Sequence, residues 1–137
     1  MKEALMGDES GDRSGVILAL EVEVRDVLTR AGFVVHGLED ERDAGVRVYS
    51  DVMPDAGAGV HVQWMVSDQL RTAAQAAFGR GDSTDGSRGL HRTANEVMSK
   101  ALLEIVVSAG FAAVLANDPV PYVVQVYLPH ENGSASG

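Results

Sequence analysis

A stripe of apolar residues spaced three and four apart runs along the first part of the chain: Ile17, Leu20, Val24, Val27, Leu28 and Ala31. This spacing is typical of a helix that buries one face. The segment Leu20–Arg25 also alternates apolar and polar residues as a strand does, so two interpretations compete. Ser14 is a suitable N-cap and Gly32 a suitable terminating glycine. We therefore predict a helix from Ser14 to Ala31.

A second copy of this pattern supports the helical interpretation. Its stripe lies within Met98–Ala109, where no strict alternation competes. The residue pairs that match at a constant offset of 78 are Ala31 and Ala109, Gly32 and Gly110, Phe33 and Phe111, Val48 and Val126, and Tyr49 and Tyr127. The sequence thus predicts an internal duplication of a helix–strand–strand unit.

Alternating residues predict five strands, at Phe33–Leu38, Val46–Asp51, Val60–Val66, Phe111–Ala116 and Tyr122–Leu128. An alanine-rich helix is predicted from Ser67 or Asp68 to Phe78. Another runs to Ala109 from a capping box at Thr93–Glu96, or from one turn earlier at Leu90. The order α-β-β-β-α-α-β-β predicts an α+β fold. Its simplest packing is a two-layer sandwich, with an antiparallel sheet of about five strands and helices on one face.

The size and composition of the chain suit one domain with a single core, since 45% of its 137 residues are apolar. We predict this domain at residues 14–129, between disordered tails at 1–13 and 130–137. No apolar run approaches the roughly 20 residues of a membrane span, and Met1–Arg13 lacks a secretory apolar core. We therefore predict no membrane association and a cytoplasmic location. The glycine-, alanine-, valine- and arginine-rich composition suggests a bacterial source.

The net charge of −9 is concentrated in the first part of the chain. Residues 1–55 hold thirteen acidic and six basic residues. A field of this sign repels phosphate backbones, so we predict no nucleic-acid partner. Solubility is the simplest use of the charge. The alternative is mimicry of a nucleic acid by an acidic ridge in residues 39–55.

The predicted sheet turns one set of side chains away from the helices: Arg47, Tyr49, His61, Gln63, Met65, Val123, Gln125 and Tyr127. Aromatic, thioether and amide groups together make an adaptable, half-apolar surface. An ordinary solvated sheet face has a similar composition, so both interpretations stay open. The candidate binding residues are Arg47, Tyr49, His61, Gln63, Met65, Gln125 and Tyr127. A protein partner or a second copy of the chain is the expected occupant.

The loop Gly79–Gly89 is rich in glycine, serine and aspartate and precedes a predicted helix. Backbone amides in such a position can bind an anion. The residues of this alternative site are Arg80, Arg88, His91 and Arg92. However, a helix rather than a strand precedes the loop, and the lysine of a P-loop is missing. A flexible linker is the competing interpretation.

Signatures of metal binding and catalysis are missing from the sequence. The chain has no cysteine, and its four histidines form no i,i+4 pair. The acidic run Glu39–Asp43 lacks the spacing and central glycine of a calcium loop, and no Gly-x-Ser-x-Gly elbow occurs. We therefore predict no metal, no cofactor and no catalytic residue. His61 with Asp51 or Glu39 would form an acid–base pair only if the fold brought them together.

The order of the first five elements resembles that of double-stranded-RNA-binding domains. Such a domain needs basic residues at its second helix, where this chain has Asp68, Gln69 and a run of alanines. The resemblance is therefore one of topology, and RNA binding is disfavoured.

These patterns favour a small acidic, non-enzymatic binding or adaptor protein that acts through the exposed sheet face. One alternative is a small-molecule binder or enzyme that takes an anionic ligand near residues 79–92. The other alternative is the acidic mimic of nucleic acid.

Overall fold

The computed structural model describes residues 2–37, 44–52, 58–117 and 121–128, with side chains from Ser14 onward. Within these ranges the elements follow in the order α1 (Lys2–Arg30), β1 (Val35–His36), β2 (Gly45–Asp51), β3 (Gly59–Met65), α2 (Asp68–Gly79), α3 (Gly86–Ser108), β4 (Ala113–Ala116) and β5 (Val123–Val126). The predicted α+β class and element order are therefore confirmed.

The strands form one five-stranded sheet in the order β1-β2-β3-β5-β4. Neighbouring strands from β2 to β4 pair antiparallel, as predicted, but β1 pairs parallel to β2. The sheet is therefore mixed, and the prediction of a purely antiparallel sheet is wrong at this edge. Parallel neighbours normally need a crossover of a dozen or more residues. Only eight residues separate His36 from Gly45, and β1 is correspondingly limited to two residues.

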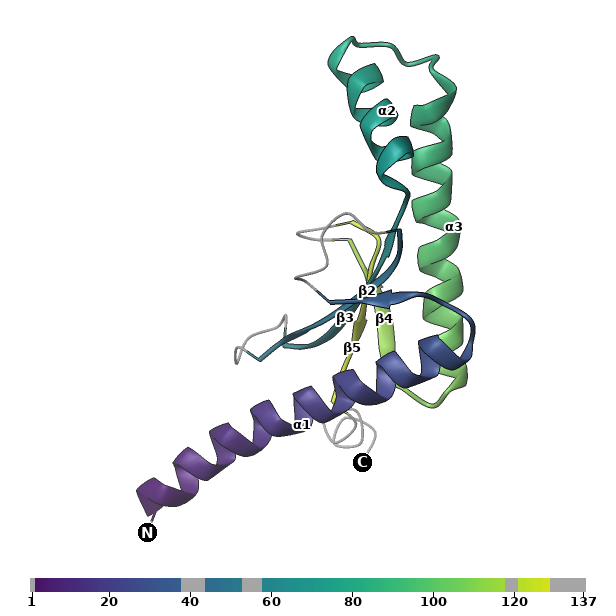
Figure 1. The fold of residues 1–137 in the computed structure, drawn as a ribbon. Coiled ribbons are helices and arrows are strands. Elements are labelled where there is room, and N and C mark those ends of the chain that lie inside the picture. The colour runs from purple at the N-terminus through teal and green to yellow at the C-terminus, as the bar shows by residue number, and fades with distance from the viewer. Residues whose placement is uncertain (1, 38–43, 53–57, 118–120, 129–137) are drawn as a thin grey trace.

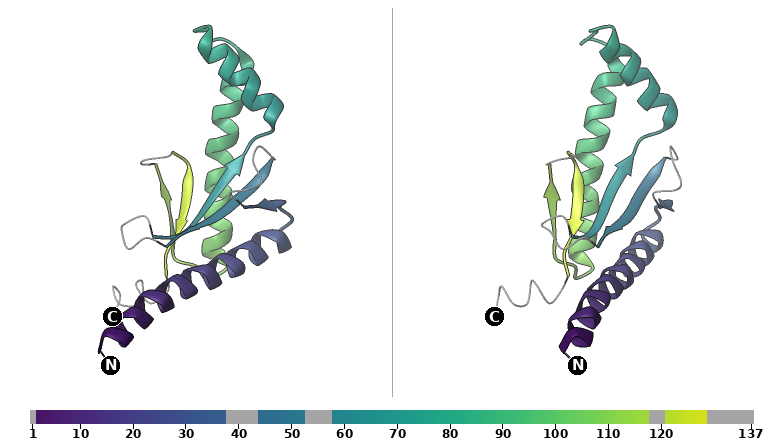
Figure 2. Two further views of the ribbon diagram at one scale, coloured as in Figure 1. Left: turned by 60° about the vertical axis from the view of Figure 1, so that its left-hand side comes forward. Right: turned by 90° about the vertical axis from the view of Figure 1, so that its left-hand side faces the viewer.

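Both long helices pack against one face of the sheet, as Figure 2 shows from two sides. The buried core joins the helical residues Ile17, Leu20, Val24, Leu28, Leu102 and Val106 to the strand residues Val46, Val48, Val60, Val62, Val124 and Val126. The strand residues share one face because side chains alternate along a strand. The predicted two-layer arrangement, with helices on one face, is confirmed.

Helix α1 includes the segment that also had a strand pattern. Leu20 and Val24 are buried one turn apart in it, so the helical interpretation is confirmed. The helix begins at Lys2, however, so the predicted start at Ser14 is wrong. Residues 2–13 contain no proline and several good helix formers, so nothing in the backbone requires a stop before Ser14. The division into one domain with two tails stays a prediction, and residues 129–137 lie outside the described part.

The two predicted helix ends close in the same way. Gly32 and Gly110 both have positive φ, at 106° and 101°. Phe33 N–H donates to Leu28 O, and Phe111 N–H donates to Val106 O, each over 3.1 Å. These are the bonds of a helix terminated by a glycine in the left-handed region. The ends of α1 and α3 therefore match in structure as well as in sequence, while a true duplication of the whole unit stays a prediction.

Helix α2 and the N-terminal end of α3 form an arm that extends beyond the sheet (Figure 1). The Ser67 hydroxyl caps α2 by accepting from Leu70 N–H, as predicted. Asp85 is the N-cap of α3, which therefore begins at Gly86. The capping box predicted at Thr93–Glu96 is wrong, because both residues lie inside α3. None of the helices in the described ranges is long and apolar enough to cross a bilayer.

Candidate functional site

Two rows of predicted binding residues cross the sheet face opposite the helices. Tyr49 lies opposite His61, and His61 lies opposite Gln125. In the next row Arg47 lies opposite Gln63. The strand register thus brings together five of the seven predicted residues, from three different strands. Met65 and Tyr127 lie further along the same face.

The centre of this face is packed rather than open. The rings of Tyr49 and His61 meet edge-on, with centroids 5.1 Å apart. Gln125 is only 8% exposed, and its Nε2 donates to Ala58 O over 3.3 Å. Gln125 therefore holds the start of β3 in place and offers little surface. The accessible part of the candidate site consists of the half-buried side chains around it.

Burial raises the pKa of the Tyr49 phenol above 10.0, because the charged form loses hydration. Nearby Arg47 opposes this shift, and Asp51 adds to it. The folded state then holds the phenolic proton more tightly than the unfolded state. The contribution of Tyr49 to the free energy of unfolding is therefore fully present below about pH 10, and it is lost as the pH rises through the raised pKa.

We expect Tyr49→Phe to remove this part of the alkaline loss of stability. The measurement is urea denaturation of wild type and variant between about pH 8 and pH 11. Tyr127→Phe is the matched control on the same face. Parallel curves for wild type and Tyr49→Phe across this range would contradict the burial of Tyr49.

Arg47 carries a buried polar atom for which the described residues provide no partner. Its Nε has no hydrogen-bond acceptor among the described contacts. A buried donor in this state is costly, and native structures contain few of them.

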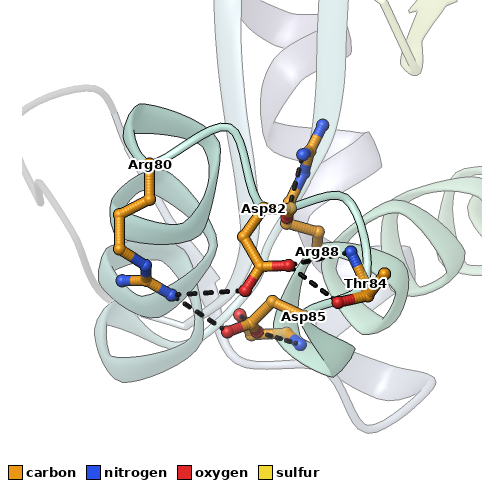
Figure 3. A network of polar contacts seen from close by, with 6 residues as sticks. Arg80, Asp82, Thr84, Asp85 and Arg88 are labelled. Carbon is orange, nitrogen blue, oxygen red and sulfur yellow. Dashed lines mark hydrogen bonds and ion pairs between the residues drawn. The ribbon is translucent and has the colours of Figure 1, made fainter.

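The alternative site at residues 79–92 is a closed turn rather than a phosphate-binding loop (Figure 3). Arg80 Nη2 lies 3.2 Å from the Asp85 carboxylate and 3.9 Å from that of Asp82. Thr84 donates to Asp82 through both its backbone N–H and its hydroxyl. Arg88 Nη1 donates to Asp82 O over 3.0 Å. Arg80 is thus neutralised by its neighbours and is not offered to a ligand.

Hydrogen bonds from Thr84 lower the pKa of Asp82, and hydrogen bonds from Ser87 lower that of Asp85. Both carboxylates are therefore anionic at neutral pH. They surround the loop with negative charge, which disfavours an anion at the loop itself.

The other three residues of the alternative site face two hollows that share His91. The first, of about 360 Å³, lies between α2 and α3 and is lined by Arg71, Ala74, Gln75, Phe78, Arg88 and His91. The second, of about 290 Å³, is lined by Gln63, Trp64, His91, Arg92, Asn95, Pro121 and Tyr122. Asn95 Nδ2 donates to His91 Nδ1 over 3.3 Å and so orients the ring. Arg92 is exposed and has no hydrogen bond or ion pair within the described ranges.

Sequence reasoning missed Trp64 and Tyr122 as lining residues. Tyr122 has φ 62°, and among the described residues it alone has positive φ without being a glycine. Asn117 Oδ1 accepts its backbone N–H over 3.1 Å. The Asn-Asp-Pro sequence before it signals a turn, but only the fold shows that Tyr122 lies beside residues of α3.

A second network that the sequence did not predict joins α1 to the edge of β2. Arg25 pairs with Glu21 over 2.8 Å and donates to Val48 O, also over 2.8 Å. The Ser50 hydroxyl donates to Glu21 over 2.5 Å. The i,i+4 spacing of Glu21 and Arg25 is visible in the sequence. Their strand partners are more than twenty residues away and are not.

We expect Arg25→Met to lower the free energy of unfolding by about 1–2 kcal/mol, because Val48 O loses its Arg25 donor and Glu21 keeps only its bond from Ser50. Arg30→Met is the matched control, since the Arg30–Asp26 pair is largely exposed. Its expected cost is about 0.5 kcal/mol or less. Thermal denaturation followed by circular dichroism measures both, and equal costs would contradict a structural role for Arg25.

The fold and the site define a class: a small two-layer α+β protein with a mixed five-stranded sheet and both long helices on one face. Comparison of the chain with protein-family models, with curated proteins and with solved structures gives no match. No three histidine, cysteine or acidic side chains of the described residues gather as a metal site would require.

Proposed function

We propose that the protein is a non-enzymatic binding or adaptor protein that holds a protein partner on the sheet face opposite its helices. The observation that carries this proposal is that Tyr49 lies opposite His61 and Arg47 lies opposite Gln63, so that four half-buried side chains meet on this face. No described helix packs on this side, because the helical core residues all contact the other face. A rigid sheet therefore presents aromatic and amide groups in fixed positions.

The chemistry of the face suits recognition more than catalysis. Tyrosine, methionine and arginine are enriched at protein interfaces. None of the seven predicted residues is a serine, a cysteine, a lysine or a carboxylate. The Tyr49 ring is already fixed against His61, so little side-chain entropy would be lost when a partner binds. A partner with a flat apolar patch and hydrogen-bond acceptors for Arg47 and Gln63 would fit this surface.

The test compares wild type with a Tyr49→Ala/Tyr127→Ala variant and a Val22→Ala/Val97→Ala control. The control removes two exposed valines from α1 and α3, away from the face. Each protein is immobilised and exposed to lysate, and a retained protein is then purified and titrated by calorimetry. We expect tight binding to wild type and control, and at least about tenfold weaker binding to the tyrosine variant. Equal affinity for all three proteins would contradict the proposal.

A second candidate function is the binding of a small organic anion in the hollow beside His91 and Arg92. The specific observation in its favour is the exposed guanidinium of Arg92, which lines a concave site and has no ion pair with another described residue. Residues 68–92 hold four arginines against three aspartates, whereas the rest of the chain is strongly acidic. This segment therefore repels an anion less than the rest of the molecule does.

Trp64 gives a direct test of this candidate, because it is the single tryptophan and lines the hollow. Phenyl phosphate is the probe, with phenol as its neutral counterpart. We expect phenyl phosphate alone to shift the Trp64 indole signal in NMR spectra. Arg92→Gln should weaken this effect about tenfold, while Arg30→Gln should not. An unchanged indole signal, or equal binding by Arg92→Gln, would remove this candidate.

A further inference from the structure

The two edges of the sheet are protected very differently. At the β1 edge, the two residues of β1 cover only the start of β2. Beyond them, Arg25 donates a hydrogen bond to the Val48 carbonyl, and Glu21 accepts one from the Ser50 hydroxyl. Charged side chains placed along an edge strand are a common means of preventing it from pairing with another strand.

At the β4 edge, the described residues provide no such protection. β4 pairs with β5 alone, and the segment from Phe111 to Asn117 contains no charged residue and no proline. No side chain of the described residues bonds to the outer edge of β4. Val114, at its centre, is 44% exposed on the same face as Gln125. An apolar, unprotected edge strand is a template for adding another strand.

The hydrogen-bonding phase of β4 shows which of its backbone groups are available. Tyr127 N–H donates to Ala112 O over 2.9 Å, so this pair is hydrogen-bonded. Bonded and non-bonded pairs alternate along an antiparallel ladder. The backbone groups of Val114 therefore point toward β5, and those of Ala113 and Leu115 point outward.

We propose that a second copy of the chain pairs with this edge, β4 against β4, in antiparallel orientation about a two-fold axis at Val114. In this register Ala113 of each copy lies opposite Leu115 of the other. Both residues direct their N–H and C=O groups outward, so the register forms hydrogen-bonded pairs on both sides of the axis. The result is a continuous ten-stranded sheet.

The two-fold register and the absence of charged residues from the segment 111–117 fit a second copy, because no like charges would face each other across the axis. A two-fold axis at Val114 sets the outward-pointing backbone groups of one copy opposite those of the other. A closed dimer requires such an axis. Val114 would pack against Val114 of the other copy, and the half-exposed Val107 of α3 lies on the element that packs against β4. The interface itself carries no charge. The net charge of −9 on each copy acts from a distance and is screened by salt, so dimerisation should strengthen as salt increases.

This interface is separate from the proposed partner face and would enlarge it. The open faces of the two copies lie on the same side of the joined sheet, so the Tyr49 rows form one extended surface. Pairing of four-residue strands buries little area, which indicates a weak and reversible dimer.

The first test is sedimentation velocity from about 5 to 500 µM protein, at about 50 and 500 mM salt. We expect a monomer–dimer equilibrium that shifts toward dimer at the higher salt. Val114→Lys should raise the dissociation constant at least about tenfold, and Val22→Lys, an equal charge change at an exposed valine of α1, should not. Ala113→Pro removes an outward N–H that makes no hydrogen bond to another described residue, and it should also abolish dimerisation.

The second test locates the axis. Because the chain has no cysteine, Val114→Cys introduces a single thiol. Across the axis the two Cα atoms would be about 4.5 Å apart, within the range of a disulfide. Oxidation should yield a covalent dimer from Val114→Cys and none from Val22→Cys.

Three results would overturn the proposal. They are a wild type that stays monomeric at every concentration and salt, a dimer that survives Val114→Lys, and a dimer lost in Tyr49→Ala/Tyr127→Ala but kept in Val114→Lys. The last result would place self-association on the sheet face instead. Should Ala113→Pro fail to fold, Val114→Lys and the disulfide decide the question.

Discussion

Gly59→Ala is expected to lower the free energy of unfolding by about 3 kcal/mol or more. Gly59 begins β3 with φ +131°, a backbone conformation that L side chains rarely adopt. A Cβ here would lie 2.5 Å from Val126 O. That oxygen belongs to the backbone of β5, so it cannot turn aside as a flexible side chain would. Alanine must therefore distort the ladder between β3 and β5 at the centre of the sheet.

Gly15→Ala is the matched control and should change stability in the opposite direction. Gly15 lies inside α1, and a Cβ there would meet no atom within 4 Å. Alanine favours the helix over glycine and reduces the freedom of the unfolded chain, by up to about 1 kcal/mol. Urea denaturation followed by circular dichroism measures both changes. Losses of similar size for the two variants would contradict the close approach at Gly59.

The sheet face could be predicted because strand side chains alternate with a period of two. Once Val48 and Val62 are placed in the core, Tyr49 and His61 must lie on the other face. The antiparallel hairpin of β2 and β3 then sets these two residues opposite each other. Local pattern and global register agree here for the placement of the side chains, while their role in binding stays a prediction.

The start of α3 and the direction of β1 could not be predicted in the same way. Asp85 and Thr93 are both acceptable N-caps, and the choice of Asp85 depends on the turn in which Arg80 and Arg88 hold the loop. The parallel pairing of β1 depends on the bond from Val46 N–H to Val34 O. Such contacts join residues that the hydrophobic pattern does not relate.

The hollows and the protected edge follow from tertiary packing alone. The sequence drew attention to His91 and Arg92 through charge and position, but it could not show that Trp64 lies beside them. Arg25 likewise reads as an ordinary surface partner of Glu21. Its contact with Val48 O is what separates the protected edge of the sheet from the bare edge at β4.

Helix α3 passes through two environments, and substitutions along it should show the difference. Leu102 is fully buried between α3 and the sheet, whereas Leu90 is 58% exposed on the arm. Leu102→Ala is expected to cost about 3 kcal/mol, since it removes core contacts and leaves a cavity that the rigid sheet cannot fill. Leu90→Ala should change stability by about 0.5 kcal/mol or less.

The difference in burial between the two ends of α3 also predicts which end unfolds locally first. Across the arm, the buried side chains of α2 are the small residues Ala74 and Ala77, which provide little contact area. We therefore expect amides of residues 86–95 to exchange with solvent faster than those of residues 99–108. Leu102→Ala should accelerate exchange in the second segment far more than in the first. Uniform protection along α3 in the wild type would mean that the arm is held by contacts as strong as those of the core.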